Sequence, residues 1–105
     1  MKYLSIGIVL LLTGCQATPT LCKAEPNALL CDSSTYNVAT IEALTTFESR
    51  AGRKAFALGK TDNGGEFYGF SEGYSSQSKA NKRALDECKK ILAKYDSNTQ
   101  CELIR

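Results

Sequence analysis

The stretch that decides the fold spans residues 54–74 and reads Lys54-Ala55-Phe56-Ala57-Leu58-Gly59-Lys60, then Thr61-Asp62-Asn63-Gly64-Gly65, then Glu66-Phe67-Tyr68-Gly69-Phe70-Ser71-Glu72-Gly73-Tyr74. In the first segment, large apolar side chains alternate with alanines, which is typical of a strand. The middle segment is a turn cluster whose residues tolerate positive φ. The third segment alternates aromatic and small side chains, so the whole stretch predicts a β-hairpin.

The predicted hairpin has two unlike faces. The aromatic face carries Phe56, Leu58, Tyr68, Phe70 and Tyr74. The other face is small, and glycines inside a strand are typical where a second backbone approaches closely. We therefore expect a helix to cover the small face, with Gly69 and Gly73 permitting its approach.

Residues 77–94 show the clearest helical periodicity in the chain, after the candidate N-cap hydroxyls of Ser75, Ser76 and Ser78. Apolar side chains recur there at spacings of three and four: Ala80, Ala84, Cys88, Ile91 and Tyr95. The opposite face is mainly basic, and its cations are Lys79, Lys82, Arg83, Lys89, Lys90 and Lys94. Residues 96–99 break the helix, and residues 100–104 predict a third short strand.

An earlier helix is predicted over residues 37–49, where Val38, Ile41, Leu44 and Phe47 recur every three positions. The expected architecture is therefore α+β, with a small antiparallel three-stranded sheet of strand order 2-1-3 and the C-terminal helix on one face. If the helix at 37–49 covers the aromatic face, that face is core, which is the interpretation we favour. If it does not, the aromatic face is an exposed binding surface that includes Tyr68 and Tyr74.

The first fourteen residues predict an export signal, because Lys2 precedes an apolar run too short to span a bilayer as a mature helix. Leu12-Thr13-Gly14-Cys15 resembles the lipobox of bacterial lipoproteins. The resemblance implies a diacylglycerol group on Cys15, cleavage before it and acylation of the new amino terminus. Gln16 then implies the periplasmic face of the outer membrane, if the host is Gram-negative. The alternative is an ordinary signal peptide with an incidental Cys15.

The expected organisation is thus a signal peptide over 1–14, a lipidated cysteine, tether and disulfide loop over 15–33, and the α+β domain over 34–105. Within the second segment, residues 16–21 predict a tether and residues 22–33 a loop without periodicity. The odd count of five cysteines becomes even once Cys15 carries lipid. Pairing Cys22 with Cys31 and Cys88 with Cys101 closes two short loops and is favoured, although the other two pairings stay open.

From Phe47 onward the chain resembles small exported bacterial proteins with a domain of unknown function. The resemblance rests on the Lys54–Ala57 strand, the glycine-aromatic strand over 68–74, the alanine-leucine helix ending near Cys88, and Cys101. Members of that family often carry a Trp in the second strand and acidic residues at the start of the helix, where this chain has Tyr68 or Phe70, and Lys79. The resemblance implies a fold and carries no activity.

The inventory of reactive groups argues against an enzyme. The chain has no His, which excludes Ser-His-Asp or Cys-His catalysis and a His metal site, and no metal or cofactor is expected. Glu66 and Glu72 share a strand face but stand about 20 Å apart on an extended strand, too far for a glycosidase carboxylate pair. A net charge of +2 is too small for a dedicated nucleic-acid binder.

We therefore expect a non-enzymatic, lipid-anchored envelope protein that binds a partner in the periplasm. The candidate binding residues are Lys79, Lys82, Arg83, Lys89 and Lys90 of the basic helix face, with Tyr68 and Tyr74. Their partner would be an envelope protein or a cell-wall polymer, and the alternative is a solvated face with internal ion pairs. Two other functions stay open: inhibition of an attacking hydrolase such as lysozyme, and an exclusion or immunity role.

Overall fold

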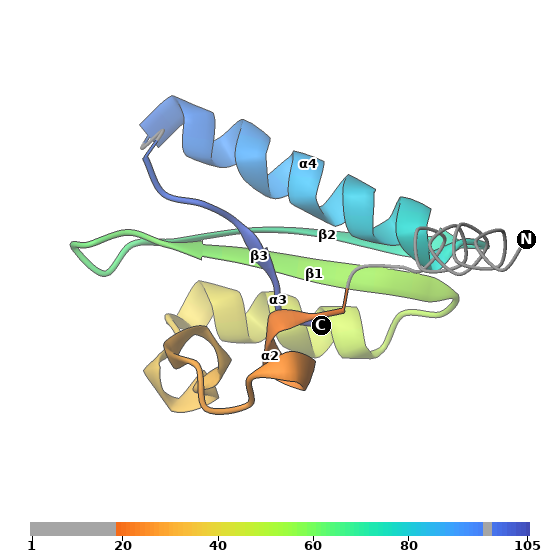
Figure 1. Ribbon diagram of the computed structural model, residues 1–105, viewed down its shortest axis with the longest axis horizontal. Helices are drawn as coiled ribbons and strands as arrows, with labels where there is room; N and C mark the ends of the chain where they lie inside the picture. The colour runs from red at the N-terminus through yellow and green to blue at the C-terminus, as the bar shows by residue number, and fades with distance from the viewer. Residues whose placement is uncertain (1–18, 96–97) are drawn as a thin grey trace, which may run out of the picture.

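A computed structural model describes residues 19–95 and 98–105 as a three-stranded sheet between two layers of helix (Figure 1). The elements in chain order are α2 (Leu21–Ala24), the 3-10 turns η1 (Leu29–Cys31) and η2 (Ser33–Thr35), α3 (Val38–Glu48), β1 (Arg53–Lys60), β2 (Glu66–Tyr74), α4 (Gln77–Tyr95) and β3 (Glu102–Leu103). The α+β prediction and its order of elements from the helix at 37–49 onward are confirmed. The predicted signal peptide and Cys15 lie outside the described residues.

The sheet has the predicted order β2-β1-β3 with antiparallel neighbours. Ala57 stands at its centre, opposite Gly69 on β2 and Leu103 on β3. The third strand is shorter than the predicted 100–104, because Cys101 is bonded to α4 above the sheet. Two further hydrogen bonds extend its pairing, from the Phe56 amide to the Arg105 carbonyl at 3.0 Å and from the Ile104 amide to the Phe56 carbonyl at 2.9 Å.

Helix α4 covers the small face of the hairpin, as predicted (Figure 1). A Cβ on Gly69 would lie 2.4 Å from the Cys88 amide nitrogen and 2.7 Å from the Ala84 carbonyl oxygen. Only a glycine fits there, since no real Cβ comes so close to another backbone. The same role for Gly73 is wrong, because a Cβ at Gly73 would meet open space.

Gly73 instead belongs to a β-bulge. Arg53 pairs with Tyr74 and Ala55 pairs with Ser71, so β2 has one more residue than β1 between the two pairs. Gly73 adopts a φ of +73°, which a glycine reaches without steric cost. The extra residue moves Tyr74 to the α4 side, where it packs against the small-residue cluster. The prediction that Tyr74 belongs to the aromatic face is therefore wrong.

Helix α3 lies against the other face and covers most of the aromatic stripe, so that stripe is core. Phe56 and Leu58 are fully buried, and Tyr68 and Phe70 are half-buried. The Phe47 ring meets the Phe56 ring edge-on, with 5.5 Å between their centroids.

The prediction that Val38, Ile41, Leu44 and Phe47 form one buried stripe of α3 is correct for only two of the four residues. Leu44 and Phe47 face the sheet together with Thr40, whereas Val38 is 72% exposed and Ile41 is 44% exposed. The reason is geometric: a spacing of three residues drifts by 60° per step around a helix of 3.6 residues per turn. Positions 38 and 47 therefore lie on opposite sides, and spacings of four and three keep 40, 44 and 47 together.

Lys54 fastens the end of α3 to the sheet. Its ammonium donates hydrogen bonds to the carbonyl oxygens of Phe47 at 2.9 Å, Glu48 at 3.1 Å and Arg50 at 2.9 Å. These carbonyls lie at and just beyond the helix C-terminus, where the helix dipole favours a cation. The sequence pattern placed Lys54 in a strand but gave no sign of this contact.

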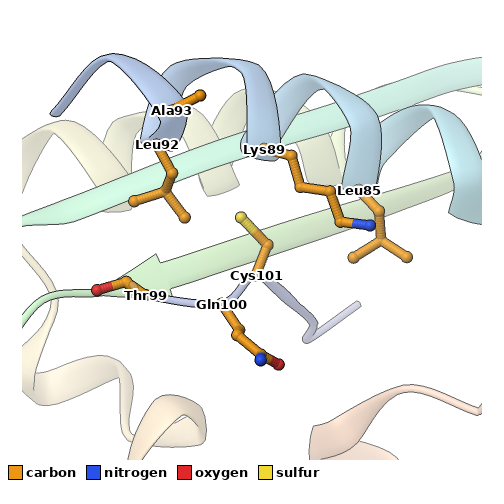
Figure 2. A pocket seen from close by; sticks show the side chains of 7 residues that line it. All are labelled: Leu85, Lys89, Leu92, Ala93, Thr99, Gln100 and Cys101. Carbon is orange, nitrogen blue, oxygen red and sulfur yellow. The ribbon is translucent and has the colours of Figure 1, made fainter. Parts of the chain in front are cut away.

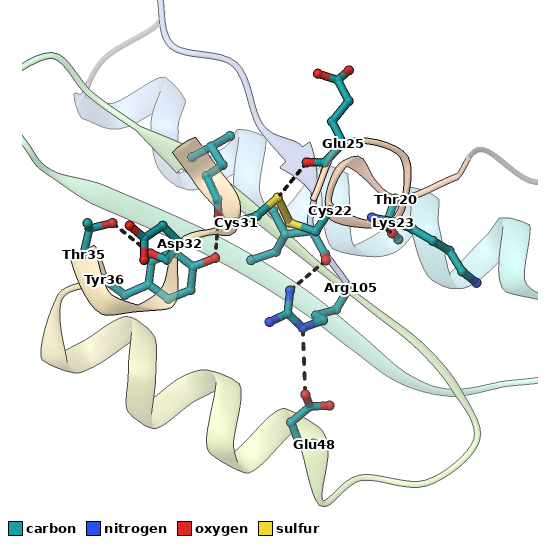
Figure 3. The surroundings of a disulfide bond; sticks show 12 residues. Thr20, Cys22, Lys23, Glu25, Cys31, Asp32, Thr35, Tyr36, Glu48 and Arg105 are labelled. Carbon is teal, nitrogen blue, oxygen red and sulfur yellow. Dashed lines mark hydrogen bonds and ion pairs between the residues drawn. A yellow bond between two sulfur atoms is a disulfide. The ribbon is translucent and has the colours of Figure 1, made fainter. Parts of the chain in front are cut away.

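The segment before α3 is more ordered than predicted (Figure 3). Residues 20–33 were expected to form the end of a tether and a loop, but they contain α2, η1 and the start of η2. Thr20 caps α2 by accepting a hydrogen bond from the Lys23 amide at 3.3 Å, and Asp32 caps η2. The favoured Cys22–Cys31 disulfide is present and joins α2 to η1. The remaining predicted tether residues, 16–18, lie outside the described part of the chain.

Candidate functional site

Helix α4 is held rigidly on the sheet, and this fixes the orientation of its outer face. Ser76 supplies the predicted N-cap: its hydroxyl oxygen accepts from the Lys79 amide at 3.3 Å. Ala80, Ala84 and Cys88 are fully buried against the strands. The favoured Cys88–Cys101 disulfide is present and ties the second half of the helix to the chain entering β3, with 6.2 Å between the two Cα atoms.

The opposite side of α4 is the basic outer face, which we define by Lys79, Lys82, Arg83, Lys89, Lys90 and Lys94. At 100° per residue these positions centre on the direction away from the buried side. Lys82 and Lys90 are 77% and 73% exposed at their side chains. All five cations predicted as binding residues on this helix therefore lie on one surface.

Ion pairs neutralise part of this face. Lys82 pairs with Asp86 at 2.7 Å and Arg83 with Glu87 at 2.8 Å, as predicted for residues four apart. Lys90 lies 3.7 Å from the same Glu87 carboxylate, three residues before it. The hydrogen bond from Lys82 lowers the pKa of Asp86 below its ordinary value. This network occupies three of the six cations.

Lys79, Lys89 and Lys94 make no ion pair with any residue in the described ranges 19–95 and 98–105. A shallow hollow of about 520 Å³ lies between the paired and the unpaired cations. Its lining consists of Arg83, Asp86, Glu87, Lys89 and Lys90. This arrangement of charges can bind an anionic surface.

A second hollow of about 500 Å³ lies beside the Cys88–Cys101 disulfide, between the end of α4 and the chain that follows it (Figure 2). Leu85 and Leu92 give it an apolar wall, and Lys89 joins it to the basic outer face. Gln100 completes the other wall. The sequence pattern did not single out Gln100, because the hollow forms only where the chain folds back after α4.

A third hollow, of about 720 Å³, marks where the described chain begins. Pro19 and Thr20 line it together with Lys54, and with Gln77 and Asn81 from the first turns of α4. Gln77 donates hydrogen bonds to the Lys54 carbonyl at 2.9 Å and to the Asn81 side-chain oxygen at 2.8 Å. The polar groups of the α4 side chains at this hollow thus hold the start of the helix to β1.

The two predicted binding tyrosines do not join the basic outer face. Tyr68 lies on the far side of the sheet, stacked on Phe56 with 5.4 Å between ring centroids. Tyr74 lies on the α4 side but packs against the buried cluster beneath the helix. The structure therefore brings the predicted cations together and places both tyrosines in packing roles.

Glu66 and Glu72 each have a separate partner. Glu66 accepts a hydrogen bond from the Asn37 amide at 2.9 Å and lies 3.3 Å from the Lys60 ammonium, with its side chain 1% exposed. Glu72 lies 3.5 Å from Arg50, where β2 ends. The hydrogen bond between Asn37 and Glu66 joins the start of α3 to the hairpin.

Comparison of the chain with protein-family models, with curated proteins and with solved structures found no match. The resemblance to an exported domain of unknown function stays a prediction. Within residues 19–95 and 98–105, no helix is both long and apolar enough to cross a bilayer. The same residues contain no cluster of three or more His, Cys, Asp or Glu side chains suited to a metal ion.

Proposed function

We propose that this chain is a lipid-anchored protein of the bacterial cell envelope, whose disulfide-bonded domain is a non-enzymatic interaction module. The observation that carries the proposal is the use of its cysteines. Four of the five form two disulfides, and the fifth is Cys15, at the position of the lipobox cysteine. Disulfides persist in oxidising compartments such as the periplasm, which is where an exported lipoprotein would fold.

The arrangement of the domain supports binding rather than catalysis. The basic outer face lies on a regular helix that packs against the sheet through buried small residues and a disulfide. Such a surface presents its charges to a partner in a fixed arrangement, without a conformational change. The envelope location and the outer-membrane assignment rest on the sequence alone, through Lys2, the apolar run, Cys15 and Gln16. Neither the hydrolase-inhibitor nor the immunity alternative gains a specific contact from the described residues.

The anchor is tested by expressing the full chain in a Gram-negative host with a clickable palmitate analogue. We expect the mature protein to carry the label and to sediment with membranes. Cys15→Ser should abolish both the label and the cleavage, because the modifying enzymes need the thiol. The matched control is the double variant Cys22→Ser/Cys31→Ser, which should keep the label. A Cys15→Ser chain that is still labelled and processed would overturn the proposal.

The interaction role is tested by crosslinking in intact cells, followed by purification of the tagged chain. We expect a reproducible envelope partner that the unlipidated Cys15→Ser chain does not capture. If the two chains capture the same set of proteins, the domain has no anchored partner and the second half of the proposal fails.

A further inference from the structure

We propose that the basic outer face of α4 binds the anionic phospholipid headgroups of the membrane that holds the anchor, so that the domain lies with α4 against the bilayer. The proposal rests on the lipid anchor proposed above and specifies what the domain touches. It names one occupant, the anionic surface of that bilayer. The observations that lead to it are the distribution of charge, the rigidity of α4 and the place where the described chain begins.

The charge of the mature chain is unevenly divided between α4 and the rest of the sequence. Helix α4 contains six basic and two acidic side chains, a net charge of +4. The rest of residues 15–105 contains six basic and nine acidic side chains, a net charge of −3. The near-neutral total therefore hides a strong asymmetry. An anionic surface attracts the α4 side and repels the remainder, which sets one orientation.

The basic outer face is also straight and fixed. A helix of 19 residues is about 28 Å long, and its cations follow one side over about 22 Å of that length. The Gly69 contact and the Cys88–Cys101 bond prevent the helix from lifting off the sheet. Lys79, Lys89 and Lys94 make no ion pair with a carboxylate of residues 19–95 and 98–105, so a phosphate displaces none of these carboxylates to reach them.

The anchor would leave the domain next to α4. Pro19 shares its hollow with Gln77 and Asn81, in the first turns of that helix. Cys15 stands four residues earlier, and four residues span at most about 14 Å. That reach keeps the first turns of α4 near the bilayer that holds the lipid. Gln77 and Asn81 lie on the sheet-facing side of the helix, so the charge of the basic outer face decides which side turns to the headgroups.

The test uses the mature lipoprotein purified from membranes and reconstituted into vesicles of phosphatidylcholine, with or without about 30% phosphatidylglycerol. The readout is the rate at which an amine-reactive, impermeant reagent acylates each lysine, followed by mass spectrometry. Phosphatidylglycerol should slow the labelling of Lys79, Lys89 and Lys94 several-fold, relative to Lys23 on α2 and Lys60 on β1. About 0.5 M salt should restore the rates, because the contact is electrostatic.

Two variants distinguish the effect of the basic outer face from the effect of the total net charge. Each cation near an anionic surface is worth about fivefold in binding at low salt, so Lys89→Glu should remove most of the protection of Lys79. Lys23→Glu changes the net charge equally but lies on α2, and it should leave that protection intact, with Lys60 as the reference. Both side chains are exposed, so neither change threatens the fold.

The outcomes separate the two proposals. An acylated protein whose α4 lysines react equally on both vesicles overturns the docking and leaves the anchor standing, and the basic outer face would then serve a polymer or an acidic protein. Equal loss of protection in Lys23→Glu and Lys89→Glu also overturns it, because total charge and not the α4 surface would be responsible. A chain isolated from membranes without acyl groups overturns both proposals.

Discussion

On one side of the sheet, α4 packs through alanines, a glycine and a disulfide; on the other, α3 packs through interlocking aromatic rings. The α4 side gains its stability from a close backbone approach at Gly69 and a covalent bond at Cys88. The α3 side gains it from burying large rings. The contrast shows how a small domain can divide its tasks: the close, covalently bonded layer carries the exposed charges, and the aromatic layer supplies apolar burial.

The largest effect is expected on the aromatic side, at Phe56. Its fully buried ring touches three others, with centroid distances of 5.5 Å to Phe47, 5.4 Å to Tyr68 and 6.0 Å to Phe70. Phe56→Ala should lower the free energy of unfolding by about 4 kcal/mol, because it removes apolar burial and leaves a cavity. Urea denaturation with the disulfides intact measures this.

The matched control for Phe56 is Tyr95→Ala. Tyr95 is 71% exposed and stacks on Phe67, so its loss should cost less than about 1 kcal/mol. If the two variants lose similar stability, then burial of rings is not what distinguishes the α3 side.

The next effect tests the covalent half of the comparison. Cys88→Ala/Cys101→Ala should cost about 3 kcal/mol, the loop-closure contribution for a separation of 13 residues. Cys22→Ala/Cys31→Ala opens a loop of similar size, but its cysteines are only half-buried, so it leaves less of a cavity and should cost somewhat less. Thermal unfolding of the two double variants compares them. A larger loss from the second pair would mean that the α2 segment, rather than the α4 layer, depends on its disulfide.

The two glycines of β2 are required for different reasons: Gly69 for the close approach of α4, and Gly73 for its positive φ. Gly69→Ala should cost about 2 kcal/mol, because its Cβ would push α4 off the sheet. Gly73→Ala has space for the methyl group but keeps a φ of +73°, and it should cost about 1 kcal/mol. Urea midpoints rank the two variants. Equal losses would mean that α4 yields at Gly69, contrary to a rigid α4 layer.

Much of the fold could be predicted because single segments carry it. The alternation in 54–74, the 3.6-residue period of 77–94 and the glycine in an otherwise aromatic strand each indicate a local structure and a neighbour. The basic outer face was predictable for the same reason, because all of its cations lie on one helix.

Two of the errors concern features that depend on another part of the chain, and one comes from the wrong helical period. Tyr74 changed face because a bulge inserts one residue, and a bulge is invisible in strict alternation. Val38 and Ile41 are exposed because a spacing of three drifts around a helix. The Lys54 contacts with the end of α3 join positions that only the folded chain brings together.

The smallest effect concerns how much of the charge of the basic outer face is neutralised by carboxylates on the same helix. Lys82 donates a hydrogen bond to Asp86, and this bond, more than the nearby charges of Lys89 and Lys90, holds the pKa of Asp86 below its ordinary value of 3.8. Since the folded-state pKa is lower than that of the unfolded chain, the pair adds stability above the ordinary value and loses it as the pH falls through the folded-state pKa. Both side chains are well exposed, so the stability change is small and the carboxyl itself is the better probe.

Carbon-13 NMR titration of the Asp86 carboxyl should show its pKa rising towards 3.8 in Lys82→Met and rising less in Lys89→Met, where the hydrogen bond survives. If Lys82→Met leaves that pKa unchanged, the hydrogen bond does not form in solution. Lys82 would then join Lys79, Lys89 and Lys94 as a cation without an ion pair among residues 19–95 and 98–105, and the α4 side would be more strongly charged than its ion pairs indicate. The protection of the α4 lysines on anionic vesicles should in that case extend equally to Lys82. If the pair does form, Lys82 should be protected less than its neighbours.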